Sequence, residues 1–251
     1  MIKEKAMSRT KAAFYHFLIS AVVFAVLAYL ILFVWYPDFF FALDGGWEGL
    51  RIIIGVDLVL GPLLTLVVFK SGKPGLKMDL ALIGLFQSMC LSAGTYVVYS
   101  ERPTFFIYYE KHFYSSSQDT FASYGRPPAD PANYSEKTPA MVYIDLPDNA
   151  IEEADVREIL FKDGIPLWIY APTYRPLEEQ MDVVITEGVS EAEMRVRDEA
   201  GNLDRWLIKH QGSFSEFAFI PIHARYRDVY LGIRIASKKI IDIVEIPPPL
   251  G

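Results

Sequence analysis

One acidic residue interrupts an apolar run of the sequence and is the first candidate for chemistry. Asp57 lies within residues 51–70, which also contain a Gly61-Pro62 pair. The eighteen residues between the flanking Arg51 and Lys70 give about 27 Å of helix, close to the hydrocarbon thickness of a bilayer. A carboxylate inside such a span is costly to bury, so it marks either a function or a packed polar contact.

The depth of Asp57 predicts its partners. With a span over 52–69, Asp57 lies about five residues, or roughly 8 Å, inside the outer end. Antiparallel packing brings Tyr29 of the preceding apolar run to this depth, together with Thr95 and Tyr96 of the following one. These three residues are the expected partners of the carboxylate.

The Gly61-Pro62 pair provides two further features for this helix. Pro62 has no N–H and therefore leaves the carbonyl of Leu58 free to accept a hydrogen bond. Gly61 lies four residues after Asp57 on the same helical face, where a neighbouring helix can approach closely. Both residues are candidates either for packing within the bundle or for contact with a partner.

The third apolar run carries small and polar residues. Gly84, Ser88 and Ser92 follow each other at intervals of four, a spacing that favours close packing of helices, and we expect that packing to lie within the chain. Gln87 lies near the middle of the run and needs a partner on another helix. Gly84, Gln87 and Ser88 join the candidate contact residues.

Other catalytic or cofactor patterns are not apparent in the sequence. No spacing typical of a metal site, phosphate-binding loop or nucleophile elbow occurs, and no cofactor is expected. The carboxylates at 152–158 are typical of a solvated helical face. The histidines show no ligand spacing; they are His16, His112, His210 and His223.

The composition divides the chain into two parts. The 251 residues are 52% hydrophobic. The first 99 residues carry eight Lys and Arg against six Asp and Glu, whereas the remainder carries sixteen against twenty-five. This pattern indicates a membrane part followed by an acidic soluble part. The acidic part does not favour nucleic acid as a partner, and the lone Cys90 allows no disulfide within the chain.

Three membrane spans are expected, at about 12–36, 52–69 and 78–100, so that 12–100 forms a membrane domain. The first run is longer than a signal-peptide core and ends without the small residues of a cleavage site, which favours a retained helix. Basic residues gather in the 1–11 segment and between spans two and three. The positive-inside rule therefore places both segments in the cytoplasm and residues 101–251 on the far side, the periplasm in a Gram-negative bacterium.

The soluble part predicts one α+β domain with an antiparallel sheet and one main helix. Strands are expected at 105–109, 141–146, 166–170, 181–186, 194–196, 206–208, 216–221, 230–235 and 240–246, because these runs are rich in aromatic and β-branched residues. A helix is expected from about 149 to 162. Residues 115–139 are rich in Ser, Pro, Asp and Asn, which is typical of a flexible stretch.

Residues 7 to about 113 resemble the TfpX/TfpZ family of type IV pilin accessory proteins. The most specific piece is GVDLVLGP at 55–62. Further matching pieces are MSR at 7–9, FVWYP at 33–37, GGW at 45–47, III at 52–54, LLT at 63–65, GLK at 75–77, DL at 79–80, Gln87 and ERP at 101–103. The resemblance covers somewhat under half of the chain.

The resemblance implies a non-catalytic, multi-pass bacterial inner-membrane protein that assists the stability, assembly or display of a cognate type IV pilin. Its expected partners are that pilin, the lipid bilayer and other components of pilus assembly. Asp57 then has two interpretations, packing within the bundle or docking of the pilin's transmembrane helix. Two other functions stay open: a membrane-anchored periplasmic sensor or ligand-binding protein, and a small membrane enzyme that uses Asp57.

Overall fold

The computed structural model describes residues 7–127 and 129–248 and separates into two compact units. The helical unit comprises Met1–Phe41 and Gly45–Ser100, and the α/β unit comprises Ala42–Asp44 and Glu101–Gly251. Lys3 and Lys5, which belong to the basic segment considered above, lie outside the described residues.

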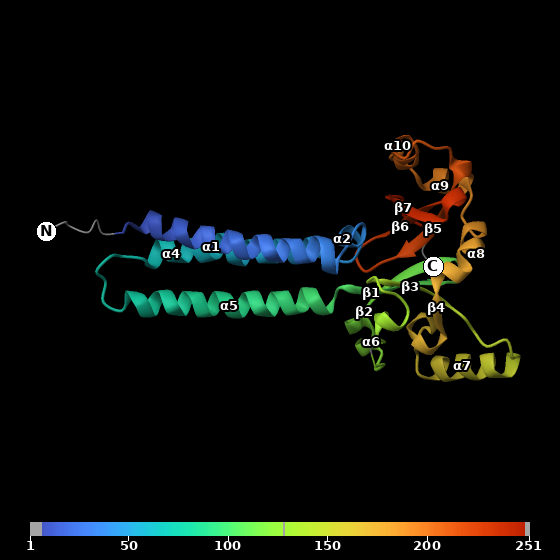
Figure 1. Cartoon of the computed structure of the whole chain (residues 1–251), viewed down its shortest axis with the longest axis horizontal. Helices are drawn as coiled ribbons and strands as arrows, with labels where there is room; N and C mark the ends of the chain where they lie inside the picture. The colour runs from blue at the N-terminus through green and yellow to red at the C-terminus, as the bar shows by residue number, and fades with distance from the viewer. Residues whose placement is uncertain (1–6, 128, 249–251) are drawn as a thin grey trace. The chain divides into compact units, whose positions relative to one another are not determined.

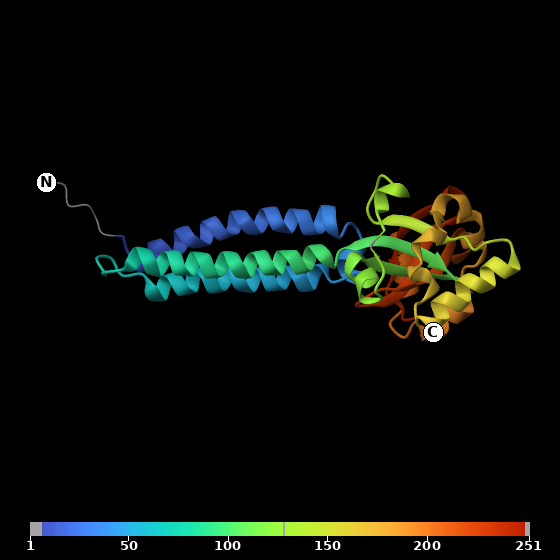
Figure 2. The ribbon, with the colours of Figure 1, turned by 90° about the horizontal axis from the view of Figure 1, so that it is seen from below.

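Three long helices lie side by side in the helical unit (Figures 1 and 2). Each is long and apolar enough to cross a bilayer, judged by length and composition. The first long helix is α1 (Arg9–Leu30), which continues as a π-helical turn at Ile31–Trp35, and the short α2 (Phe40–Leu43) follows it. The second long helix is continuous through α3 (Gly46–Ile53), a π-helical segment (Ile54–Leu60) and α4 (Gly61–Val68). The third is α5 (Leu76–Ser100).

The second long helix begins six residues earlier than the predicted span. Its first residue is Gly46, directly after Gly45, whose φ of 93° ends the preceding turn. Glu48 lies in the first turn, where a negative charge interacts favourably with the helix dipole. The prediction leaves residues 46–51 outside the span because they are not continuously apolar. It therefore places Asp57 too close to the outer end of the helix.

A packed apolar cluster holds the three helices together near this end. The hydroxyl of Tyr36 donates a 2.8 Å hydrogen bond to the carbonyl of Val98 on α5. Gly49 faces the same Val98 so closely that a Cβ atom at this position would overlap the valine side chain. Ile31, Leu50 and other apolar side chains fill the space around these contacts.

The α/β unit is built on one seven-stranded sheet (Figure 1). The strand order is β4-β3-β1-β2-β5-β6-β7. The strands are β1 (Pro103–Tyr109), β2 (His112–Ser117), β3 (Ala140–Ile144), β4 (Tyr174–Pro176), β5 (Phe217–His223), β6 (Asp228–Arg234) and β7 (Lys239–Val244). The sheet is mixed, because β1 pairs with β3 and β2 pairs with β5 in parallel, while the other neighbours are antiparallel. The predicted all-antiparallel sheet is wrong at these two junctions.

Several runs that were predicted as strands are helical. The run at 166–170 contains a 3₁₀ turn, and those at 181–186, 194–196 and 206–208 lie in α8, α9 and α10. The helices of this unit are α6 (Gln118–Ser123), α7 (Ala150–Lys162), α8 (Met181–Thr186), α9 (Glu191–Arg197) and α10 (Asn202–Lys209). The expected helix corresponds to α7, whereas the stretch 115–139, expected to be flexible, contains the end of β2 and all of α6.

The central strands are buried along most of their length. The side chains of β1 from Pro103 to Tyr108 and those of β5 from Phe217 to Ile222 are buried. One core cluster surrounds Phe105, Phe121 and Tyr174, and the other surrounds Trp206 and Phe219. Successive side chains of a strand point to opposite faces, so these unbroken buried runs mean that the central strands are covered on both faces. This explains why the strand runs are nearly continuously apolar.

Candidate functional site: a polar cluster and an apolar groove in the helical unit

Asp57 lies in the interior of the helical unit, within the π-helical segment Ile54–Leu60. Its side chain is only 4% exposed. The hydroxyl of Ser20 on α1 donates to Oδ1 at 3.1 Å, and the side-chain amide of Gln87 on α5 donates to the same oxygen. Oδ2 has no hydrogen-bond partner among the described residues. The carboxyl group therefore joins all three helices through one of its oxygens.

Gln87 extends this cluster towards two more polar residues. Its Oε1 lies 2.9 Å from Nε2 of His16, whose Nδ1 lies 2.5 Å from the hydroxyl of Thr65. Because the amide NH₂ faces Asp57, the carbonyl oxygen of Gln87 faces His16 and can only accept. Nε2 of His16 therefore donates to this oxygen, and Nδ1 lies within hydrogen-bond distance of the Thr65 hydroxyl. Five side chains form a continuous network.

The backbone around Asp57 explains why Gln87 is placed here. The N–H of Gly61 bonds to the carbonyl of Val56, the five-residue spacing of a π-helix. In that register the carbonyl of Asp57 would accept from residue 62, but Pro62 has no N–H. The amide of Gln87 lies 3.3 Å from this carbonyl and donates to it. The proline thus exposes the carbonyl of Asp57, rather than the predicted Leu58, and a side chain on α5 satisfies it.

Gly61 permits this contact sterically. A Cβ atom at Gly61 would overlap the carboxamide group of Gln87. The carboxamide cannot turn away without losing its bonds to Asp57 and His16. The close approach that the sequence predicted at Gly61 is therefore filled by Gln87 of the same chain.

The expected partners of Asp57 lie elsewhere. Tyr29 and Tyr96 are 60% and 70% exposed, and Thr95 lines a groove described below. The true partners, Ser20 and Gln87, lie eight or nine residues further from that end of their helices. The predicted partners are wrong because the predicted span begins at residue 52, whereas the helix begins at Gly46. Asp57 is therefore six residues, or about 9 Å, further from the start of the helix than the prediction placed it.

Three members of the cluster were not among the candidates: His16, Ser20 and Thr65. A signal was present in the sequence, since His16 and Ser20 are polar residues spaced by four in an apolar helix and must share one face. Thr65 follows Gly61 by the same interval.

The small-residue stripe of α5 points away from the bundle. Gly84, Ser88 and Ser92 are all exposed, and a Cβ atom at Gly84 would meet nothing within 4 Å. The expectation that this stripe packs within the chain is wrong. Gln87, one position from Ser88, instead faces inward.

An apolar groove lies between α1 and α5. Ser92 and Thr95 are the polar side chains in its wall. The remaining lining residues are Val22, Val23, Val26, Leu27, Trp35, Leu91, Tyr96 and Tyr99. Ser92 belongs to both the stripe and the groove, so the two features adjoin on the outside of the helical unit.

The fold defines a class of protein in which three apolar helices of membrane-spanning length precede an α/β unit. Within residues 7–127 and 129–248, no group of three or more His, Cys, Asp or Glu side chains is arranged to hold a metal ion. The family described as "Fimbrial assembly protein FimB" matches residues 4–44.

Three curated relatives come from Dichelobacter nodosus. The chain is 37% identical over 106 residues to a fimbrial assembly protein of serogroups C1 and C2, and this match covers 41% of the chain and 80% of that relative. Matches of the same identity and length to the proteins of serogroups I and E1 cover 41% of each relative. The chain belongs to the fimbrial assembly protein family. The chain spans less than half the length of the relatives of serogroups I and E1. No solved structure matches the chain.

Proposed function

We propose that this protein is a non-catalytic accessory in the biogenesis of type IV pili that binds the apolar helix of a cognate pilin. Its membership of the fimbrial assembly family supports the process. The resemblance of residues 7–113 to type IV pilin accessory proteins supports the finer assignment. The observation that carries the binding mode is the apolar groove between α1 and α5 in a member of this family.

The groove suits an apolar helix better than it suits a soluble ligand. Lipid tails are as apolar as the aliphatic side chains of a protein, so the hydrophobic effect does not drive helices together inside a bilayer. Helices associate there through close packing and hydrogen bonds. Gly84, Ser88 and Ser92 provide a surface on which a second helix can approach closely. Ser92 and Thr95 add hydroxyl groups within the groove.

The polar cluster supports this groove from the inside. Its hydrogen bonds join α1, the π-helical segment Ile54–Leu60 and α5 through Ser20, Asp57 and Gln87, so the relative positions of α1 and α5 are constrained. Docking of a pilin directly at Asp57 would require displacement of Gln87, which covers Gly61. We therefore assign Asp57, Gly61 and Pro62 to packing, and Gly84 and Ser88 to the pilin contact.

The proposal places the three helices across the bacterial inner membrane, with the basic ends cytoplasmic and the α/β unit periplasmic. Arg9 and Lys11 lie in the first turn of α1, Lys70 and Lys73 lie between α4 and α5, and Lys77 lies in the first turn of α5. In a Cys90→Ser background, a membrane-impermeant maleimide should label Ser213→Cys in cells with a permeabilised outer membrane. Lys73→Cys should react only after the inner membrane is broken, and early labelling of Lys73→Cys would reverse the orientation.

Enlarging the stripe tests the function. Gly84→Leu combined with Ser88→Leu should reduce co-purification of pilin and the number of surface pili by several-fold, while the abundance of the protein is unchanged. Val67→Phe on α4 is a matched control, since Val67 is also exposed on an apolar helix outside the groove. Normal piliation of the double variant would contradict the proposed contact.

The alternative of an enzyme that uses Asp57 has little geometric support. Any substrate would have to reach a carboxyl group enclosed by α1, α4 and α5. A ligand-binding role for the α/β unit is the second candidate, favoured by the polar pocket in that unit.

A further inference from the structure

A pocket of about 530 Å³ lies within the α/β unit. All of its lining residues belong to this unit, and they include Asp44, Glu101, Tyr114, Trp168, His223 and Arg225. Its volume falls within the range of small-molecule sites, about 300–1,000 Å³. The pilin-accessory function proposed above gives this pocket no role.

One side of the pocket is aromatic. The ring of Trp168 stacks on Tyr114 with 5.1 Å between centroids and an angle of 6° between the planes. Tyr124 meets Trp168 edge-on at 6.3 Å, and His223 lies 5.4 Å from Tyr114. Tyr174 donates a 2.5 Å hydrogen bond to the carbonyl of Trp168 and thereby holds its backbone. The pocket thus has a fixed aromatic wall.

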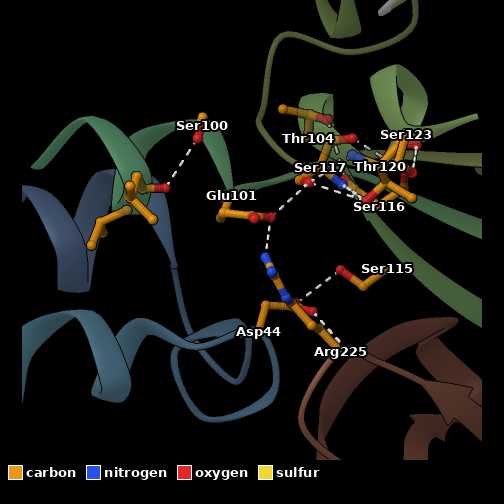
Figure 3. Close-up of polar contacts among 12 residues, drawn as sticks. Asp44, Ser100, Glu101, Thr104, Ser115, Ser116, Ser117, Thr120, Ser123 and Arg225 are labelled. Atoms are coloured by element: carbon orange, nitrogen blue, oxygen red, sulfur yellow. Dashed lines mark hydrogen bonds and ion pairs between the residues drawn. The ribbon is translucent and has the colours of Figure 1, made fainter. Parts of the chain in front are cut away.

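Other lining residues are polar, and Figure 3 shows the contacts among them. Ser115 donates to Oδ2 of Asp44 at 2.8 Å, and Arg225 forms an ion pair with Glu101. Ser117 lies 3.4 Å from Glu101 and donates to it. Hydroxyl groups and paired charges therefore form this wall together, and Thr120 and Ser123 add two more hydroxyls.

The charges of the pocket discriminate between classes of ligand. A phosphate would be repelled by the carboxylates of Glu101 and Asp119. The guanidinium of Arg225 would attract it, but this group is paired with Glu101. An amine would meet that same guanidinium, and Asp44 is too buried, at 4% exposed, to approach it directly. A wholly apolar ligand would make no hydrogen bond with the hydroxyl groups and charged side chains that line the pocket.

A sugar ring satisfies both walls at once. Its C–H faces are apolar and pack against aromatic rings, while its hydroxyl groups donate to and accept from Ser, Thr, Arg and carboxylate side chains. We propose that this pocket binds a short neutral saccharide, with Trp168 and Tyr124 as the stacking wall and Ser115, Ser123 and Arg225 as polar contacts. This proposal is independent of the pilin groove.

Binding should be measured on the full chain in lipid nanodiscs, because glycoside detergents would present competing sugars. Maltotriose and the trisaccharide of N-acetylglucosamine are titrated by calorimetry or ligand-observed NMR up to about 10 mM. At least one should bind saturably, with phosphate and N-acetyl-lysine amide binding more weakly. Nanodiscs that contain a glucosyl diacylglycerol distinguish a lipid-borne saccharide from a soluble one. If the pocket binds the sugar headgroup of a lipid, this lipid should compete with the soluble probes; if it binds only soluble saccharides, the lipid should not compete.

Two variants assign the binding to this pocket. Trp168→Ala should weaken it by about tenfold, in line with the loss of one aromatic stacking contact. Tyr124→Ala, at an exposed position, tests the same wall if Trp168→Ala does not fold. Phe161→Ala is the control, because Phe161 is exposed on α7 outside this pocket. Absence of saccharide binding by the native chain, equal affinity of folded Trp168→Ala or Tyr124→Ala, or tighter binding of phosphate or the amine would each overturn the proposal. Pilin co-purification, measured in the same preparations, reports separately on the groove.

Discussion

At the scale of single residues, Asp57 acts in this structure as a hydrogen-bond acceptor. Oδ1 accepts from Ser20 and Gln87, and Oδ2 accepts from neither. An asparagine can keep its Oδ1 in the same position and present its NH₂ where Oδ2 lies. What the cluster requires is therefore the acceptor oxygen, and a negative charge adds no further bond to it.

This distinction gives the first prediction. Asp57→Asn should leave the thermal unfolding midpoint of the full chain nearly unchanged. Asp57→Leu leaves the buried amide of Gln87 without its acceptor and should cost about 1–2 kcal/mol. Unfolding followed in one detergent for both variants checks the prediction; equal destabilisation by Asn and Leu would mean that the charge itself stabilises the bundle.

Asp44 gives a second prediction at the same scale, in the α/β unit. Burial raises the pKa of Asp44 from 3.8 to about 6, although the Ser115 hydroxyl, the Arg225 N–H and the Arg225 charge all act to lower it. The folded protein then holds a proton on this group between pH 4 and 6 that the unfolded chain has lost, so stability falls as pH rises through this window.

The expected loss is about 3 kcal/mol for a shift of roughly two pKa units. It should appear as the difference between the native chain and Asp44→Asn, since other carboxylates titrate equally in both. Relative to the variant, the native chain should be more stable at pH 4 than at pH 7. A difference that does not change with pH would contradict the raised pKa.

At the scale of elements, the sequence predicts what local periodicity controls. The three apolar helices, β1, β3, α7 and the final strands β5 to β7 appear close to their expected positions. The long helix over Gly46–Val68 is extended beyond its apolar core, because Trp47 and Glu48 are compatible with a helix but do not identify one. This one boundary accounts for the wrong partners of Asp57.

The short helices could not be recognised from β-branched content. Met181 and Val184 of α8 are buried three residues apart, and Leu203 and Trp206 of α10 show the same spacing. Local signals of a helix were present, since Asp198 caps α10 by accepting from the N–H groups of Asn202 and Leu203. The parallel pairing of β2 with β5 depends on contacts between distant segments, which periodicity does not report.

Gly232 on β6 provides the test of packing at this scale. A Cβ atom there would overlap the ring of Trp206 on α10. Gly232→Ala should therefore destabilise the α/β unit by about 1–3 kcal/mol in chemical denaturation. Trp206→Leu removes the overlapping ring, so the cost of Gly232→Ala should shrink in this background, and additive effects of the two changes would contradict the contact.

At the scale of the whole molecule, inward and outward faces of α5 have different roles in our account. The inward face carries Gln87, which completes a network within the chain. The outward face carries Gly84, Ser88 and Ser92, and continues into the groove shared with α1. The sequence indicated the importance of both sets of residues but not which face each occupies, because that depends on how the helices pack.

Photocrosslinking from two adjacent positions on α5 distinguishes contact with pilin from packing within the chain. A photoreactive amino acid is placed at Ser88 or at Gln87 in living cells, and adducts to pilin are detected after illumination. Ser88, which faces outward, should yield a pilin adduct, while Gln87, which is 7% exposed, should yield only adducts within the chain. An adduct from Gln87 but none from Ser88, with both proteins intact in the membrane, would contradict the account.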